Sequence, residues 1–202
     1  MSETDTATTG QAAPTRRSRF ASVVTRLARE IDEGAEHPMP KGDLTALRRD
    51  GGARSPTFYK VAARLLSEVL DEYRSETALV AAERQWAMLV HLLACTGGQH
   101  RVGAASLGAV LAQAGLAEAR FLRLLRAEGD SLDSASRAAL APLVQQALTF
   151  DPLDLAALVL TAAPNARTAA SLHYEDRDSV RRRIARDFYR AEAKENSATD
   201  SK

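Results

Sequence analysis

The sequence predicts an all-α protein of two small helical bundles joined by a glycine-containing linker. Alanine and leucine dominate the apolar residues, which make up 45% of the 202 residues, and both favour helices over strands. Apolar residues recur every three to four positions along most of the chain, as they do on the buried face of a helix. Between the periodic segments, residues 96–103 contain three glycines and form the expected linker.

The N-terminal bundle is expected over residues 19–96. Residues 1–18 are rich in serine, threonine, alanine and glutamine without apolar periodicity, which predicts a disordered tail. The bundle's helices are predicted from apolar spacing and from breaks at glycine and proline. Their expected ranges are 20–32, 44–49, 55–70 and 76–95.

The C-terminal bundle is expected over residues 104–195. Gly115 should end a helix that starts at residue 104, because glycine tolerates the left-handed turn that closes helices. A second short helix follows Gly115, and His100 and Arg101 in the linker are expected to be exposed. The remaining helices are predicted over 132–148, 153–162 and 176–193.

The most informative stretch is SLGAVLAQAGLAEARFLRLLRA at residues 106–127. In its second helix, four apolar residues fall on one half of the helical wheel, and Arg120, Arg123 and Arg126 cluster on the other. A guanidinium group is permanently charged and matches phosphate oxygens in a bidentate way, so the row predicts binding to a polyanion. A solvated helix face with no ligand is the alternative interpretation.

Further arginines are predicted to face outward from other helices. In the last helix, Val180, Ile184 and Phe188 lie on one face, and a second row of arginines gathers on the other. Arg48 and Arg49 end the short helix at 44–49. The arginines of the last helix are Arg182, Arg183, Arg186 and Arg190.

Composition and missing motifs exclude several classes of function. The net charge of +1 gives no general attraction to nucleic acid, so anion binding must come from local segregation of charge. The single cysteine, Cys95, excludes an internal disulfide framework and suits a reducing cytoplasm. No apolar run is long enough for a membrane span, and no hydrophobic signal core is present. Because no phosphate loop, metal-spaced histidine pair or nucleophile motif occurs, we expect no enzyme activity, cofactor, metal or small-molecule substrate.

Four stretches, taken in order, resemble a known family. They are GDLTALRRD (42–50), SPTFYKVAARLL (55–66), the stretch at 106–127, and RRRIARDFY (181–189). The chain carrying them resembles CasB, the small subunit of the type I-E Cascade CRISPR surveillance complex. It departs from the family pattern at Arg137, which stands alone where the family often has a basic pair, and at Leu155, which replaces a tryptophan.

The resemblance implies a non-catalytic subunit of an antiviral ribonucleoprotein. It implies two helical bundles and two copies packed head to tail beside other Cascade subunits. Its nucleic-acid partners would be the crRNA, the target DNA and the non-target DNA. The subunit would stabilise the pairing of the crRNA with the target and would hold the displaced DNA strand. Binding would follow the sugar–phosphate backbone without sequence specificity, and base stacking should be minor because few aromatic residues accompany the arginines.

Ten arginines are therefore the candidate nucleic-acid-binding residues. They are Arg48, Arg49, Arg101, Arg120, Arg123, Arg126, Arg137, Arg182, Arg183 and Arg186. The alternative function is a helical protein–protein adaptor or transcription regulator, in which the arginines are solvated surface.

Overall fold

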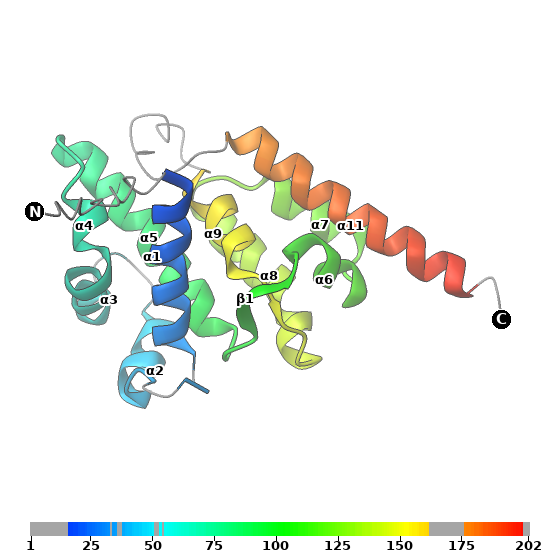
Figure 1. Cartoon of the computed structure of the whole chain (residues 1–202), viewed down its shortest axis with the longest axis horizontal. Helices are drawn as coiled ribbons and strands as arrows, with labels where there is room; N and C mark the ends of the chain where they lie inside the picture. The colour runs from blue at the N-terminus through cyan, green and yellow to red at the C-terminus, as the bar shows by residue number, and fades with distance from the viewer. Residues whose placement is uncertain are drawn as a thin grey trace, which may run out of the picture.

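The fold was analysed in a computed structural model that describes residues 16–32, 34–35, 38–50, 53, 55–161 and 176–199. The described chain is mainly helical with one short strand, so the predicted all-α class is confirmed (Figure 1). None of the helices in these ranges is both long and apolar enough to cross a membrane. Of the tail predicted over 1–18, residues 1–15 lie outside the described residues, as does the predicted loop around Pro164. Residues 16–18 belong to a helix, so the tail prediction is wrong for them.

The first half of the chain follows the predicted helices closely. The helix predicted over 76–95 is confirmed at both ends, whereas the first helix begins at Arg16, four residues before its predicted start. The helix predicted over 55–70 contains a five-residue π-helical segment, which the periodicity did not indicate. The elements are α1 (Arg16–Ile31), α2 (Lys41–Arg49), α3 (Pro56–Val61), η1 (Ala62–Leu66), α4 (Ser67–Leu70) and α5 (Glu76–Cys95).

The second half begins with a strand, at residues 100–105, where the sequence predicted linker and, from residue 104, helix. It continues with helices of 7 to 23 residues. Gly115 adopts a φ of +68° just beyond α6, which confirms its predicted role at the end of that helix. The last helix runs to Thr199, six residues past its predicted end. The elements are β1 (His100–Ala105), α6 (Leu107–Gln113), α7 (Glu118–Arg126), α8 (Asp130–Gln145), α9 (Pro152–Leu160) and α11 (Arg177–Thr199).

The expectation that His100 is exposed is wrong. Its side chain is 2% exposed, its Nε2 atom donates to the carbonyl oxygen of Ala28 at 3.0 Å, and its Nδ1 atom lies 2.7 Å from Oγ1 of Thr96. Burial lowers the pKa of His100, so the neutral ring is favoured. The histidine therefore ties the glycine-containing segment to α1.

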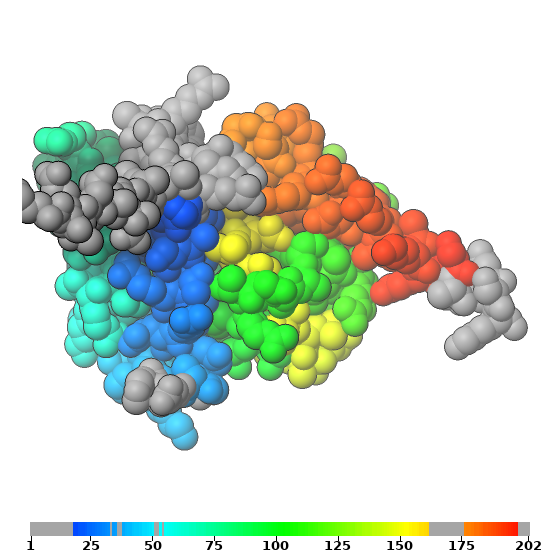
Figure 2. Space-filling model, in the orientation of Figure 1, coloured from blue at the N-terminus to red at the C-terminus, as the bar shows by residue number. Residues whose placement is uncertain are grey.

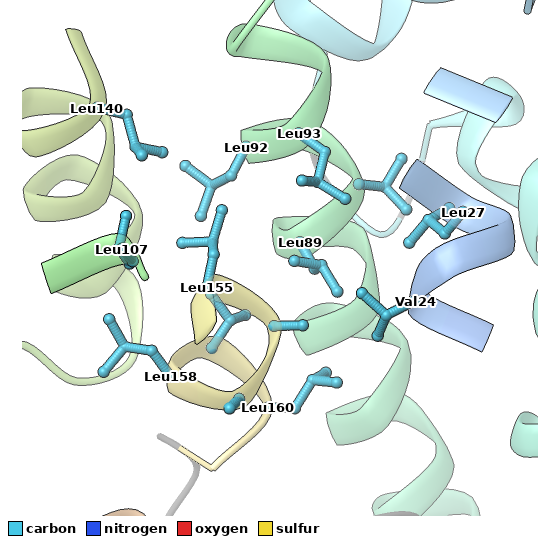
Figure 3. Close-up of a cluster of buried hydrophobic side chains, with 14 of the residues drawn as sticks. Val24, Leu27, Leu89, Leu92, Leu93, Leu107, Leu140, Leu155, Leu158 and Leu160 are labelled. Carbon is cyan, nitrogen blue, oxygen red and sulfur yellow. The ribbon is translucent and has the colours of Figure 1, made fainter. Parts of the chain in front are cut away.

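One continuous cluster of buried apolar residues connects the two halves of the chain. Helix α9 packs against both α5 and α1, and α8 also contacts α5. Figure 3 shows the α5 side chains between those of α1 and α9: Val24, Leu27, Leu89, Leu92, Leu93, Leu155, Leu158 and Leu160. The division into bundles at 19–96 and 104–195 stays a prediction.

Helix α11 packs lengthwise on α6 and α9, and its C-terminal end extends past the other helices (Figures 1 and 2). Val180, Ile184 and Phe188 form its buried face. The Phe188 ring stacks on Phe121 of α7, with ring centres 3.8 Å apart and planes inclined by 9°. These contacts fix α11 beside α7, so both predicted arginine rows are mounted on packed helices.

Candidate nucleic-acid interface

Helix α7 presents its arginines as the sequence predicts. Phe121 and Leu124 are buried, while Arg120, Arg123 and Arg126 are exposed. In the part of the chain that the structure describes, none of these three arginines forms an ion pair. Helix α7 therefore presents three uncompensated positive charges on its exposed face, while its other face is packed in the core.

A cavity of about 600 Å³ lies beside this row, between α7 and α8. Arg123 and Arg126 line it together with the hydroxyl-bearing residues Ser131 and Ser134, and three apolar residues complete the lining: Ala119, Leu122 and Ala127. The hydroxyls of Ser131 and Ser134 already donate to the carbonyl oxygens of Glu128 and Ser131, at 2.7 and 3.0 Å. The groups in this cavity that suit an anionic oxygen are therefore the two guanidinium groups.

On α8, Arg137 is held by an acidic neighbour. Its Nε atom donates to Oδ2 of Asp133 at 2.9 Å, one helical turn away. The other carboxylate oxygen, Oδ1, lies 3.8 Å from Nε2 of His91 on α5. Asp133 thereby connects α8 to α5 and neutralises part of the charge that Arg137 brings to this surface.

His91 connects this surface to the end of α2. Its Nδ1 atom donates to the carbonyl oxygen of Leu47 at 2.8 Å. The next residue, Arg48, donates from Nε to the carbonyl oxygen of Ala94 at 2.7 Å, and Arg49 pairs with Asp50 at 2.9 Å. Contacts between neighbouring elements therefore link the arginines of α7 and α8 to those of α2.

Arg183 of α11 forms an ion pair between helices of the fold. Its guanidinium lies 3.2 Å from Oδ1 of Asp154 on α9, and Oδ2 of the same carboxylate accepts from the backbone N–H of Leu107 at 3.0 Å. Burial raises the pKa of Asp154, and the Leu107 hydrogen bond and the Arg183 charge oppose that rise. The pair joins α11, α9 and the start of α6.

The other candidates on α11 and β1 lie on the surface. Arg182 and Arg186 are exposed, and Arg182 donates to Oγ of Ser179 at 3.1 Å. Arg101 is exposed on β1. The contacts that link α7, α8, α5 and α2 do not include these three residues.

Sequence reasoning missed the acidic partners of several arginines. The Asp133–Arg137 pair has the i,i+4 spacing that stabilises helices, and that spacing was available in the sequence. Arg181 was not a candidate, but it donates to the carbonyl oxygen of Ala127 at 3.1 Å and lies 3.6 Å from Glu128. No local spacing indicates that contact, because the chain folds back over more than fifty residues to make it.

Removing Arg183 should destabilise the protein. In an Arg183→Ala variant, the nearly buried Asp154 carboxylate keeps its backbone partner but loses its charged one. We expect the free energy of unfolding to fall by about 2 kcal/mol. Exposed Arg182 provides the matched control, because Arg182→Ala should change it by less than about 0.5 kcal/mol. Urea denaturation measures both, and equal stabilities would show that the ion pair contributes nothing.

The stability that His91 contributes should decrease as pH rises. The Cys95 sulfur, the Leu47 carbonyl and the Asp133 charge raise the pKa of His91, although burial opposes them. Because the folded pKa exceeds the unfolded value of about 6.5, this contribution is complete below that pH and is lost as pH rises through the folded pKa.

Comparing wild type with His91→Gln from pH 6 to pH 8 tests this expectation. The difference between their unfolding free energies should shrink over that interval, because only wild type loses a stabilising proton. A difference that is constant or grows with pH would contradict the assignment. His100 does not obscure the comparison, since both proteins contain it.

The helices and the uncompensated guanidinium groups together define an all-α protein with a surface suited to anions. Within the described ranges, no three histidine, cysteine, aspartate or glutamate side chains are grouped so that they could hold a metal ion.

The family model for CRISPR-associated protein Cse2 matches residues 43–189, so the chain belongs to the Cse2 family. This is the CasB family of the type I-E Cascade small subunit, and the resemblance drawn from the four stretches is confirmed. Membership makes the chain a structural subunit of a CRISPR Cascade complex that contains other subunits. No curated protein and no solved structure matches it.

Proposed function

We propose that this Cascade subunit binds the sugar–phosphate backbone of nucleic acid without sequence specificity and has no catalytic role. The observation that carries the proposal is the row of Arg120, Arg123 and Arg126, exposed on one helix and unpaired among the described residues. Guanidinium groups on a rigid helix suit phosphate oxygens, which recur along any strand regardless of base sequence. Sequence recognition would then reside in base pairing with the guide RNA.

Within the complex, the subunit would stabilise the crRNA–target duplex and hold the displaced DNA strand. The row on α7, the cavity between α7 and α8, and the arginines of α2 offer one track for a backbone. Arg182 and Arg186, both exposed on α11, offer a second positive surface. Two surfaces on one subunit would suit two nucleic-acid segments, and a second copy packed head to tail would lengthen each track. The site of action would be the cytoplasm.

A helical adaptor between protein subunits is the second candidate. It is favoured by the arginines that already have acidic partners, namely the pairs Arg49–Asp50, Arg137–Asp133 and Arg183–Asp154. In that function the free arginines of α7 would meet acidic surfaces of neighbouring subunits. A charge-compensated surface costs less to bury against protein than an uncompensated one.

Salt dependence of DNA binding separates the two functions. The purified chain would be titrated against a fluorescently labelled single strand at several salt concentrations, with anisotropy as the readout. A backbone-binding protein loses affinity linearly on a logarithmic salt scale, with a slope of about 0.7 per phosphate contact on a single strand. An adaptor would bind the strand at none of these concentrations, which would overturn the proposal for the free chain.

A further inference from the structure

Tyr189 is a large aromatic side chain that the fold leaves at the surface. It is 38% exposed and lies one residue beyond Phe188, the last large apolar residue on the buried face of α11. Its hydroxyl donates to Oε1 of Glu118, at the start of α7, at 2.8 Å. An exposed tyrosine held at its hydroxyl end is oriented more firmly than one that turns freely in solvent.

The ring of Tyr189 is also fixed by two buried phenylalanines. It is nearly perpendicular to both, with ring centres 5.4 Å from Phe188 and 6.0 Å from Phe121. Those two rings are stacked 3.8 Å apart. A ring on top of the stack would lie farther from one phenylalanine than from the other by about the stacking distance. The distances from Tyr189 to Phe188 and to Phe121 are nearly equal, so Tyr189 lies beside the pair. The phenylalanines therefore do not sandwich its ring, and its exposed part remains open to solvent.

Two exposed arginines share the helix face of Tyr189. At 100° per residue, Arg182, Arg186 and Tyr189 fall within about 60° of one another. At 1.5 Å per residue, Arg186 lies about 4.5 Å and Arg182 about 10.5 Å along the axis from the tyrosine. Both arginines are exposed. Arg182 donates to the Ser179 hydroxyl, which in turn donates to Asp176. That hydrogen bond and the charge of Arg182 both help to lower the pKa of the Asp176 carboxyl. The two positive charges thus lie on the N-terminal side of the Tyr189 ring along α11.

Two carboxylates lie near the hydroxyl end of Tyr189. Glu118 accepts the hydroxyl hydrogen bond, and Glu192 is close enough to raise the pKa of Tyr189 along with Glu118. Carboxylates repel phosphate groups, so a bound strand would keep its backbone over the two arginines. A base attached to that backbone could then reach the ring, because stacking needs an aromatic face and no positive charge.

We propose that Tyr189 is a stacking platform for an unpaired nucleobase of a single strand whose phosphates bind Arg182 and Arg186. This inference rests on the proposed backbone-binding function and adds a residue that contacts a base rather than the backbone. It also revises the expectation that base stacking is minor, because Tyr189 shares the arginine face of α11 and its contacts with α7 orient the ring. Every base has a π face, so the platform prefers unpaired bases to paired ones without choosing among sequences.

An abasic strand provides the matched ligand for the test. The full-length chain would be titrated by anisotropy with a labelled single strand and with a strand of equal length and charge that carries abasic residues throughout. Wild type should bind the base-containing strand roughly 5- to 140-fold more tightly, the range expected for stacking of one base. Tyr189→Leu should reduce that preference to less than about twofold, and Tyr189→Phe should retain most of it because the ring remains.

Removing the two arginines tests the backbone contact separately from the stacking contact. The double variant Arg182→Ala with Arg186→Ala should weaken binding to both strands by a similar factor, since both carry the same phosphates. If wild type binds both strands equally, or if Tyr189→Leu keeps the preference, the stacking platform is overturned and backbone binding stands. If wild type binds neither strand at low salt, both proposals fail for the free chain.

Discussion

Replacing Arg120, Arg123 and Arg126 together with alanine should weaken binding to a single strand about 100-fold at low salt. Each arginine is exposed and has no acidic partner among the described residues, so its charge is available to a phosphate. An exposed charge contact contributes up to about 1 kcal/mol, and three such contacts give an effect of this order. The slope of the logarithm of affinity against the logarithm of salt concentration should fall by about 2 units.

The matched control is a second triple variant with the same change in net charge. Arg29, Arg74 and Arg84 are exposed on or beside α1 and α5, and none of them is a candidate for the interface. Converting these three residues to alanine should reduce affinity less than about threefold, through the general loss of positive charge alone. Equal weakening by the two triple variants would show that α7 is not a specific binding surface.

Both triple variants should remain folded. The guanidinium groups that they remove are exposed, and alanine has the higher helix propensity. Their melting temperatures should therefore stay within about 4 °C of wild type. A large loss of stability confined to the α7 variant would mean that the row is structural. The same pair of variants, assembled into Cascade, would report on retention of the displaced strand.

The sequence predicted α7 well because its evidence is local. The alternation of apolar residues and arginines within nine residues determines which face is buried, and the tertiary structure has the same face inside. Helix α5 was predicted at both ends for a similar reason, since Glu76 follows a break and the apolar run stops at Thr96. Periodicity is a strong signal wherever a helix carries a single continuous apolar stripe.

The sequence failed where distant segments meet. Arg183 looks like its neighbour Arg182 on a helical wheel, but the fold places Asp154 opposite only one of them. His100 lies just after two glycines in the predicted linker, and its side chain bonds a carbonyl oxygen of α1 that lies 72 residues earlier. For Arg183 the pairing of its charge is therefore a property of tertiary packing, whereas the acidic partners of Arg49 and Arg137 lie close by in the sequence.

Gly108→Ala should destabilise the protein by about 3 kcal/mol or more. Gly108 is buried where α6 meets α11, and a Cβ atom there would lie 2.2 Å from the carbonyl oxygen of Ile184 and 3.0 Å from the backbone nitrogen of Phe188. Both of these are backbone atoms, so no side-chain rotation can relieve the overlap. Helix α11 would have to move away from α6, at the high end of the cost of overpacking a core.

Gly42→Ala is the control for this substitution. Gly42 lies in α2, and a Cβ atom added there would meet nothing within 4 Å. Because alanine is the better helix former, that variant should keep its stability or gain up to about 1 kcal/mol. At about 2–4 °C per kcal/mol, thermal unfolding should place Gly108→Ala roughly 6–12 °C or more below wild type.

Gly108→Ala should also change strand binding, because α11 carries Tyr189 and the residues that hold this helix in place. A displaced α11 separates Phe188 from Phe121 and Arg183 from Asp154, so Tyr189 loses the contacts that orient its ring. The preference for a base-containing strand over an abasic one should therefore disappear at temperatures where the variant is still folded. Binding through Arg123 and Arg126 beside α8 should persist, because α7 and α8 also contact each other directly. A Gly108→Ala protein as stable as Gly42→Ala would show that α11 does not pack against α6 at this distance.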